Sequence, residues 1–101
     1  MSDCAVTRID DRLQVAGDMN IYTAAVIKEQ LVALAPCLGE DVEIDLSGVT
    51  GLDTAGVQIM LMLRRLAHSR GVPFRLVSPS AVAVEVLELC GLQSLVTEHA
   101  S

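Results

Sequence analysis

Residues 45–57 read DLSGVTGLDTAGV, and this stretch decides how the middle of the chain folds. It begins inside an alternating apolar segment, residues 42–46, that predicts a half-buried strand. Polar residues and glycines typical of a turn come next. A long apolar segment over 55–70 then predicts a helix, which Gly71 and Pro73 end. Asp53 and Thr54 are therefore expected at the junction where a strand passes into a helix.

The segments on either side continue the alternation of strand and helix patterns. Further strands are predicted over residues 4–9, 12–16, 74–77 and 95–97. Further helices are predicted over residues 24–36 and 79–90. Gly17-Asp18 is expected to end the second strand, and Thr23 and Ser78 are the expected N-caps. This order predicts an α/β fold with a mixed sheet, in which an antiparallel hairpin precedes parallel strands.

The composition is that of one compact domain over residues 1–101. The chain is 51% hydrophobic, contains no Trp, and carries a net charge of −6, which disfavours nucleic acid and anionic membranes as partners. Its three cysteines are too widely spaced for a disulfide framework or a CxxC metal site, which fits a reducing cytoplasm. Cys37 and Cys90 have apolar neighbours and are expected to be small core residues. No signal peptide and no membrane span are expected.

The predicted helix after Asp53 is more apolar than one buried face requires. A sufficient core stripe is formed by Gly56, Ile59, Met60, Leu63, Leu66 and Ala67. Leu61 and Met62 are additional to this stripe and lie on the same side of the helix as Thr54. Two interpretations stay open: neighbouring helices cover this side as well, or it is a surface for a partner protein.

Thr54 is expected at the helix N-terminus, where unpaired N–H groups and a positive partial charge suit a phosphate. Gly56 would let another chain approach closely. The simpler interpretation is an ordinary helix cap, because Asp and Thr are common caps.

Patterns for enzymatic chemistry are weak. His68 and His99 are distant in sequence from Asp53-Thr54, so Thr54 lacks the neighbouring base that nucleophilic catalysis needs. Acidic side chains that alternate or pair on one face are expected to be solvated: Asp41, Glu43, Asp45, Glu85 and Glu88. We therefore predict no catalytic residue, no metal site and no cofactor.

Three blocks of the chain together resemble the STAS domain of anti-sigma factor antagonists and sulfate transporters. They read GDMNIYTAAVIKEQL, VEIDLSGVTGLDTAGVQIMLMLRRL and GVPFRLVSPSAVAVEVLELCGL. The resemblance covers nearly the whole chain. It implies a STAS fold: a four- or five-stranded mixed sheet with helices mainly on one side.

The resemblance also implies a function. Antagonists of this kind bind an anti-sigma factor, usually a histidine-kinase-like ATPase that acts as a serine/threonine kinase. The kinase phosphorylates the hydroxyl residue that follows the motif Asp, which is Thr54 here, and the complex then dissociates through local charge repulsion. The expected partner contacts are Asp18, Ser47, Asp53, Ala55, Gly56, Gln58 and Met62. Asp18-Met19 and Ser78–Ser80 are expected at loop ends near this site.

The chain departs from the regulated antagonists at Thr54-Ala55, where they usually carry Ser followed by Ser or Thr. Two alternatives therefore stay open. One is a STAS subunit that docks on the ATPase of a Mla-type lipid ABC transporter, with Thr54 as a contact. The other is a STAS protein of a chemotaxis-like signalling system. Insertion into a membrane and binding of nucleic acid are expected in none of them.

Overall fold

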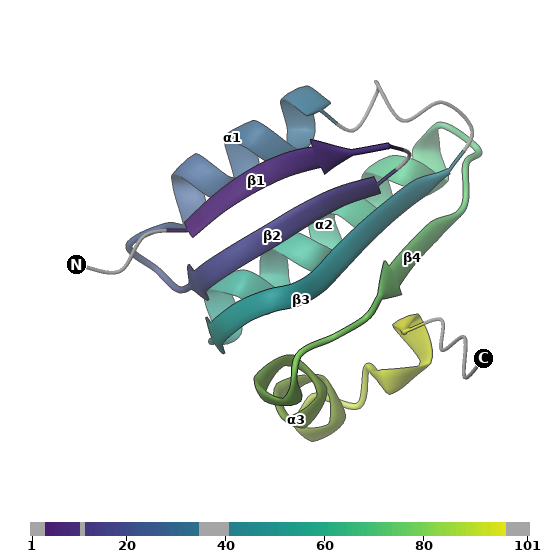
Figure 1. Ribbon diagram of the computed structural model, residues 1–101. Helices are drawn as coiled ribbons and strands as arrows, with labels where there is room; N and C mark the ends of the chain where they lie inside the picture. The colour runs from purple at the N-terminus through teal and green to yellow at the C-terminus, as the bar shows by residue number, and fades with distance from the viewer. Residues whose placement is uncertain (1–3, 11, 35–40, 97–101) are drawn as a thin grey trace.

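A computed structural model describes residues 4–10, 12–34 and 41–96 of the chain and builds one four-stranded sheet with helices packed around it (Figure 1). The elements are β1 (Cys4–Ile9), β2 (Arg12–Met19), α1 (Ala24–Leu34), β3 (Val42–Leu52), α2 (Thr54–Ser69), β4 (Phe74–Val77), α3 (Ala81–Leu89) and the 3-10 helix η2 (Gln93–Leu95). The predicted mixed α/β architecture is confirmed.

The sheet has the order β1-β2-β3-β4. β1 and β2 form the expected antiparallel hairpin, whereas β2–β3 and β3–β4 pair in parallel. Leu13 and Val15 of β2 and Ile44 and Leu46 of β3 are fully buried, while the residues between them point to the other face. This alternation follows from the pleat of a strand, which sends successive side chains to opposite faces.

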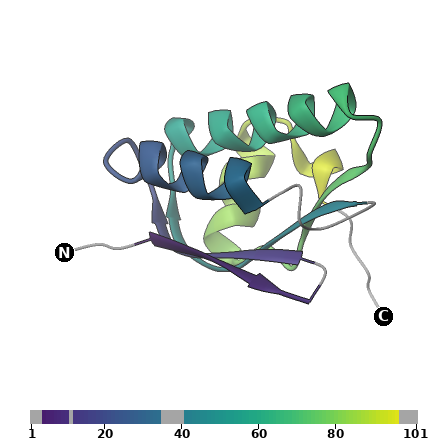
Figure 2. The same cartoon turned by 90° about the horizontal axis from the view of Figure 1, so that it is seen from above.

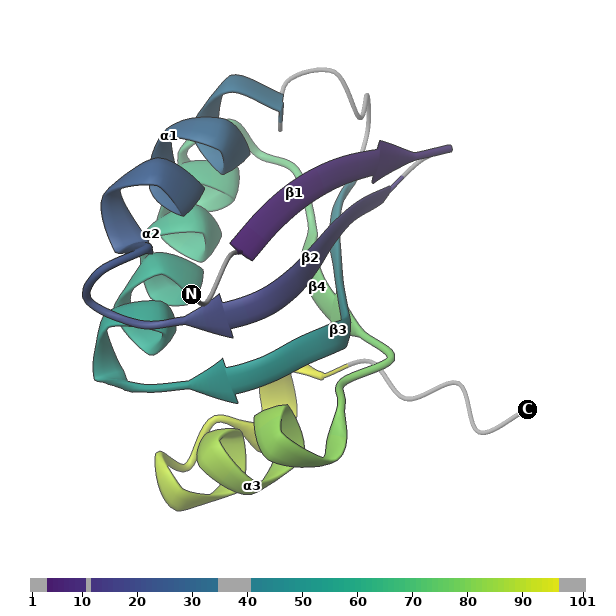
Figure 3. The ribbon, with the colours of Figure 1, turned by 60° about the vertical axis from the view of Figure 1, so that its left-hand side comes forward.

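Helices α1 and α2 lie side by side on one face of the sheet (Figure 2). Helix α3 instead lies beside β3 (Figure 3). The short β4 pairs only as far as Asp45, and the backbone N–H of Ser80 then donates to the Leu46 carbonyl at 3.1 Å. Because α3 takes over where β4 ends, the second half of β3 has β2 along one edge and α3, in place of a strand, along the other.

Both central strands run farther than their sequence patterns predicted. β3 continues through the turn-like residues to Leu52, and β2 continues past Gly17 to Met19. The two strands stay paired because two register shifts, each with one additional residue on β3, absorb the irregular residues. A Cβ atom at Gly48 would lie 2.8 Å from the Cβ of Ala16, so close contact between the strands requires glycine there.

Two predicted helix caps are corrected by the structure. Ser78 has a left-handed backbone (φ 49°), and Ser80 caps α3 through its side chain, which accepts from the Ala83 N–H at 3.2 Å. The Ser78-Pro79 pattern marked the loop correctly but placed the helix start two residues early. Thr23 does precede α1, yet its hydroxyl accepts from the Asn20 N–H and donates to the Asp18 carbonyl inside the preceding turn.

The C-terminal part differs from the expected last strand. Residues 93–95 form a 3-10 helix, and Val96 makes a single parallel bridge to Leu76. Cys90 is exposed at the end of α3, so the prediction of a core cysteine is wrong there, because its position falls on the outward side of the last turn. Cys37, Thr97 and His99 lie outside the described residues.

The sheet face without helices carries a network of charged side chains across three strands. Arg12 of β2 pairs with Glu43 (Nε–Oε1 3.3 Å) and with Asp45 (Nη1–Oδ2 3.4 Å) of β3. Arg75 of β4 pairs with Glu43 and with Asp41. Asp45 is only 8% exposed and also accepts from the Ser47 N–H at 2.8 Å. The expectation that these three acids are simply solvated is therefore wrong, because each of them forms an ion pair with Arg12 or Arg75.

Candidate functional site

Asp53 and Thr54 occupy the junction of β3 and α2 as expected. Asp53 is the N-cap of α2, and its Oδ1 accepts from the N–H groups of Ala55 (2.9 Å) and Gly56 (3.4 Å). Thr54 is the first helical residue; its side chain is exposed, and its hydroxyl has no hydrogen-bond partner among the described residues. The cap therefore uses the Asp53 carboxylate and leaves the Thr54 hydroxyl available at the positive end of the helix.

Gln58 and Met62 follow Thr54 at four-residue intervals and lie on the same side of α2. Gln58 is exposed, whereas Met62 is half-buried and packs against the core. Leu61 is half-buried as well, and α2 contacts α1 on its flank. Met62 is thus not surplus to the core, because its half-buried side chain packs against it.

Gly56 serves packing inside the chain. It is buried, and an added Cβ would lie 2.5 Å from Leu52 Cδ1 and 2.9 Å from Met19 Cβ. The glycine lets the first turn of α2 pack closely against the ends of β2 and β3. Gly56 is therefore covered by its own chain. The expectation that it lets another protein approach closely is wrong. Ala55, beside it, is half-buried.

Asp18 lies at the same end of the sheet as Thr54. The Asp53 N–H donates to the Met19 carbonyl at 3.1 Å, which joins the end of β2 to the start of α2 and confirms the expected position of Asp18-Met19. The Asp18 carboxylate accepts from the Thr50 hydroxyl at 2.5 Å, and Gly51 leaves room for it. Burial, and the charge of Asp18 nearby, raise the pKa of the Cys4 thiol on β1.

Two expected members of the site lie elsewhere. Ser47 is exposed on the helix-free face of the sheet, where its hydroxyl accepts from Gln14 Nε2 at 3.4 Å. Ser80 is held beside Leu46, which is six residues before the end of β3, or roughly 20 Å along the strand. The short β4 is the reason that the Ser78–Ser80 loop does not reach Thr54.

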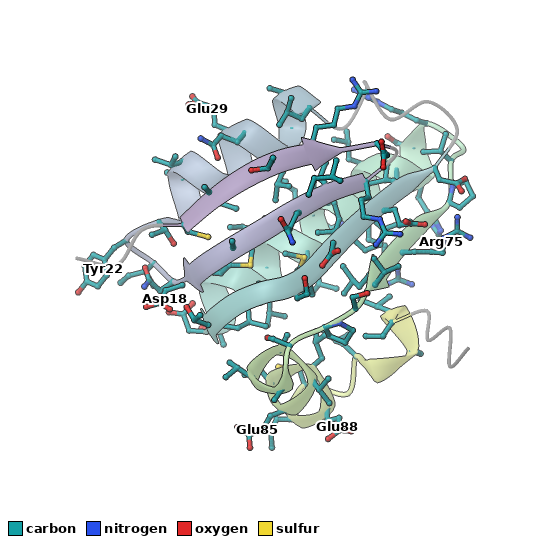
Figure 4. All side chains as sticks on the ribbon, viewed as in Figure 1. Asp18, Tyr22, Glu29, Arg75, Glu85 and Glu88 are labelled. Atoms are coloured by element: carbon teal, nitrogen blue, oxygen red, sulfur yellow. The ribbon has the colours of Figure 1, made fainter. Side chains whose placement is uncertain are left out.

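Sequence reasoning missed Thr50 and the turn after β2. Thr50 was interpreted as a turn residue, but it lies on β3 and holds Asp18. Ile21 and Tyr22 lie in the turn between β2 and α1. Tyr22 is at the end of the sheet where Asp18 also lies (Figure 4). Only the tertiary pairing of β2 with β3 could have revealed these neighbours.

The chemistry available at this end is that of an exposed Thr54 hydroxyl next to the Asp53 cap, with the Asp18 carboxylate at the same end of the sheet. His68 is exposed near the far end of α2, roughly 21 Å from Thr54 along the helix, and so cannot serve it as a base. In the part of the chain that the structure describes, no three His, Cys, Asp or Glu side chains are grouped as metal ligands. Nor does any helix there have the length and apolar character needed to cross a bilayer.

Comparison with known proteins assigns the family. A family model described as "Mlab, STAS domain" matches residues 3–97. The chain belongs to the STAS domain family. This chain is also similar to the anti-sigma-B factor antagonist of Bacillus subtilis (strain 168). The two are 26% identical over 87 residues, which cover 86% of this chain and 79% of that protein.

Solved structures of STAS proteins share the fold. An anti-sigma factor antagonist from Mycobacterium paratuberculosis superposes with a TM-score of 0.74 at 21% identity, covering 95% of this chain and 83% of that one. The anti-sigma factor antagonist SpoIIAA in its unphosphorylated form gives 0.73 at 13% identity, covering 94% and 86%. Its phosphorylated form, from Bacillus, gives 0.66 at 13% identity, covering 94% and 89%. The predicted STAS fold is therefore confirmed, with four strands in the described residues.

Proposed function

We propose that this STAS domain is a cytoplasmic protein-interaction switch of the anti-sigma factor antagonist kind. Its partner is an anti-sigma factor that acts as a serine/threonine kinase of the histidine-kinase-like ATPase type. The partner phosphorylates Thr54 and thereby releases the domain. One observation carries this proposal: the Thr54 hydroxyl is exposed at the first position of α2, while Asp53 performs the capping that would otherwise engage it.

The electrostatics of the site support a switch that needs no refolding. A phosphate on Thr54 adds roughly −1.5 to −2 charges. In the free domain the α2 N-terminus stabilises that charge. In a complex, Asp53 is adjacent and Asp18 lies at the same end, so a partner that packs closely there must accommodate all of these negative charges. The added charge therefore weakens the complex more than it disturbs the fold.

Relatives support the same proposal. The Bacillus subtilis relative is named for antagonism of an anti-sigma factor, and SpoIIAA occurs in unphosphorylated and phosphorylated forms. In this proposal the Thr54 hydroxyl is the substrate of another protein's kinase, and the domain itself performs no catalysis and needs no cofactor.

A phosphorylation assay tests the proposal. Anti-sigma factor kinases from the genome that encodes this chain are purified, and each is incubated with the domain, Mg²⁺ and ATP. We expect one of them to add a single phosphate to the intact mass, and peptide mapping to place it on Thr54. Thr54→Ala is expected to abolish the gain, whereas Thr7→Ala, which removes an exposed hydroxyl on β1, is expected to leave it unchanged. Modification at another residue, or intact binding without any phosphate, would overturn the switch.

A second candidate function is docking on the ATPase of a Mla-type lipid ABC transporter. The description of the matching family model favours it. In this case Thr54 is a contact that stays unmodified. Recovery of a transporter ATPase with the tagged domain, with binding lost in Thr54→Arg and retained in Thr7→Ala, is the result that supports docking.

A further inference from the structure

We propose that Ile21 and Tyr22 form the apolar anchor of the partner-binding surface around Thr54, and that this surface fits a cationic protein surface with an apolar cleft. The inference rests on the proposed switch, because it describes the chemistry of the partner that binds at the same end of the sheet. We call the residues of this end the strand-end surface: Asp18, Ile21, Tyr22, Asp53 and Thr54.

The strand-end surface exposes large apolar side chains to solvent. Tyr22 is 87% exposed and Ile21 is 64% exposed, in the turn between β2 and α1. Val26, which is 53% exposed, lies in the first turn of α1, directly after this turn. Single apolar residues on a surface are common, but these three are exposed within six consecutive residues at one junction of turn and helix.

The turn that presents them is fixed by its own hydrogen bonds. Asn20 Oδ1 accepts from the N–H groups of Tyr22 (2.8 Å) and Thr23 (3.1 Å). The Thr23 hydroxyl donates to the Asp18 carbonyl at 2.8 Å. A turn already held in one conformation loses little entropy when a partner binds it. Tyr22 is thus an exposed aromatic residue on a preorganised backbone, and aromatic residues of this kind contribute much of the binding energy in protein interfaces.

The turn is adjacent to the phospho-acceptor. Met19, two residues before Ile21, accepts the hydrogen bond from the Asp53 N–H at 3.1 Å. Tyr22 and Asp18 lie together at one tip of the molecule (Figure 4). A partner that reaches Thr54 closely enough to phosphorylate it therefore also covers part of this turn.

Charge gives the chemistry of the partner. The strand-end surface contains two carboxylates, and the Asp18 carboxylate is held in place by the Thr50 hydroxyl. None of the seven Lys and Arg side chains belongs to this surface. Two are near the turn of the β1–β2 hairpin, one is in α1, two are in the second half of α2, one directly follows α2, and one is in β4. Arg75 is at the opposite end of the view from Asp18 (Figure 4). A cationic surface is therefore complementary to this end of the domain.

Binding measurements with the kinase that phosphorylates the domain test this inference. Tyr22→Ala is expected to weaken binding by roughly tenfold or more, while Tyr22→Phe keeps the ring and stays within about twofold of the wild type. Val32→Ala is the control, because Val32 is also exposed but lies eight residues, or roughly 12 Å, after the start of α1 at Ala24. Raising the salt concentration is expected to weaken the wild-type complex, and Asp18→Asn is expected to reduce that salt dependence.

The outcomes separate this inference from the proposed function. If the wild type is phosphorylated and bound but Tyr22→Ala binds equally well, the switch stands and the anchor is wrong. The cationic partner is wrong if binding is insensitive to salt. If sedimentation shows a dimer that Tyr22→Ala dissociates without changing kinase binding, the patch joins two copies of this chain and the inference fails. If no kinase binds, the inference fails together with the switch.

Discussion

Asp53, Thr54 and Gly56 lie within one turn of α2 and have three separate tasks. Asp53 caps the helix, Thr54 presents a hydroxyl to solvent, and Gly56 gives the helix close contact with the strand ends. The sequence could predict the first two, because capping residues and helix starts have local signals. It could not predict the third, because spacing along a chain does not reveal whether a glycine faces a partner or the chain's own core.

We expect Gly56→Ala to lower the free energy of unfolding by about 1–3 kcal/mol, measured by urea denaturation. The added methyl group would overlap Met19 Cβ and would lie 3.1 Å from the Met19 carbonyl oxygen, neither of which can move without shifting the backbone. This loss is expected even though Ala is the better helix former by ~1 kcal/mol. Gln58→Ala, on the exposed side of α2, serves as the control and should change stability little. Equal or greater stability of Gly56→Ala would show that this glycine is not needed for packing.

At the scale of elements, the order of strands and helices was predictable, but the extent of β2 and β3 was not. Residues 47–51 contain two glycines, a serine and a threonine, which locally indicate a turn. Pairing with β2 overrides that local preference and carries β3 on to Leu52. The additional length brings Asp53 and Thr54 to the edge of the molecule, beyond the end of β2.

The charged network on the helix-free face gives a test of how the three strands are held together. We expect Arg12→Met to lower the free energy of unfolding by about 1 kcal/mol, because Asp45 stays buried without its cation. This loss is small because the Arg12 side chain is 41% exposed, so solvent partly screens its attraction to Asp45.

Arg8→Met is the matched control for this measurement. The Arg8 side chain is exposed, and its Nε donates to the Asp10 backbone carbonyl at 3.3 Å; no ion pair of Arg8 is found within residues 4–10, 12–34 and 41–96. Its loss should change stability by less than about 0.5 kcal/mol. If the two variants lose the same stability in urea denaturation, the network across β2, β3 and β4 does not stabilise the sheet.

At the scale of the whole molecule, the topology explains which candidate residues meet. Parallel strands bring their carboxyl ends to one edge, so Asp18 of β2 and Asp53 after β3 could be expected together. The same rule failed for Ser78–Ser80, because β4 ends beside Asp45 and α3 occupies the remaining edge. β4 ends at Val77 as its pattern predicted, whereas β3 runs on to Leu52, and this length, which no local pattern indicated, decided the difference.

The distribution of charge is also a property of the whole fold. Lys and Arg side chains lie away from Thr54, although nothing in their order along the chain indicates this. The domain thus has an acidic end with an exposed hydroxyl, and a phosphate there would deepen an existing asymmetry.

Charge at residue 54 is expected to control partner binding. The most direct test measures the affinity of three proteins for the same kinase: wild type, Thr54→Ala and Thr54→Glu. Circular dichroism should show all three folded, because the residue 54 side chain is exposed. The account predicts that Thr54→Ala binds nearly as tightly as the wild type and that Thr54→Glu binds at least about tenfold more weakly. Equal affinity of Thr54→Glu and Thr54→Ala would contradict it.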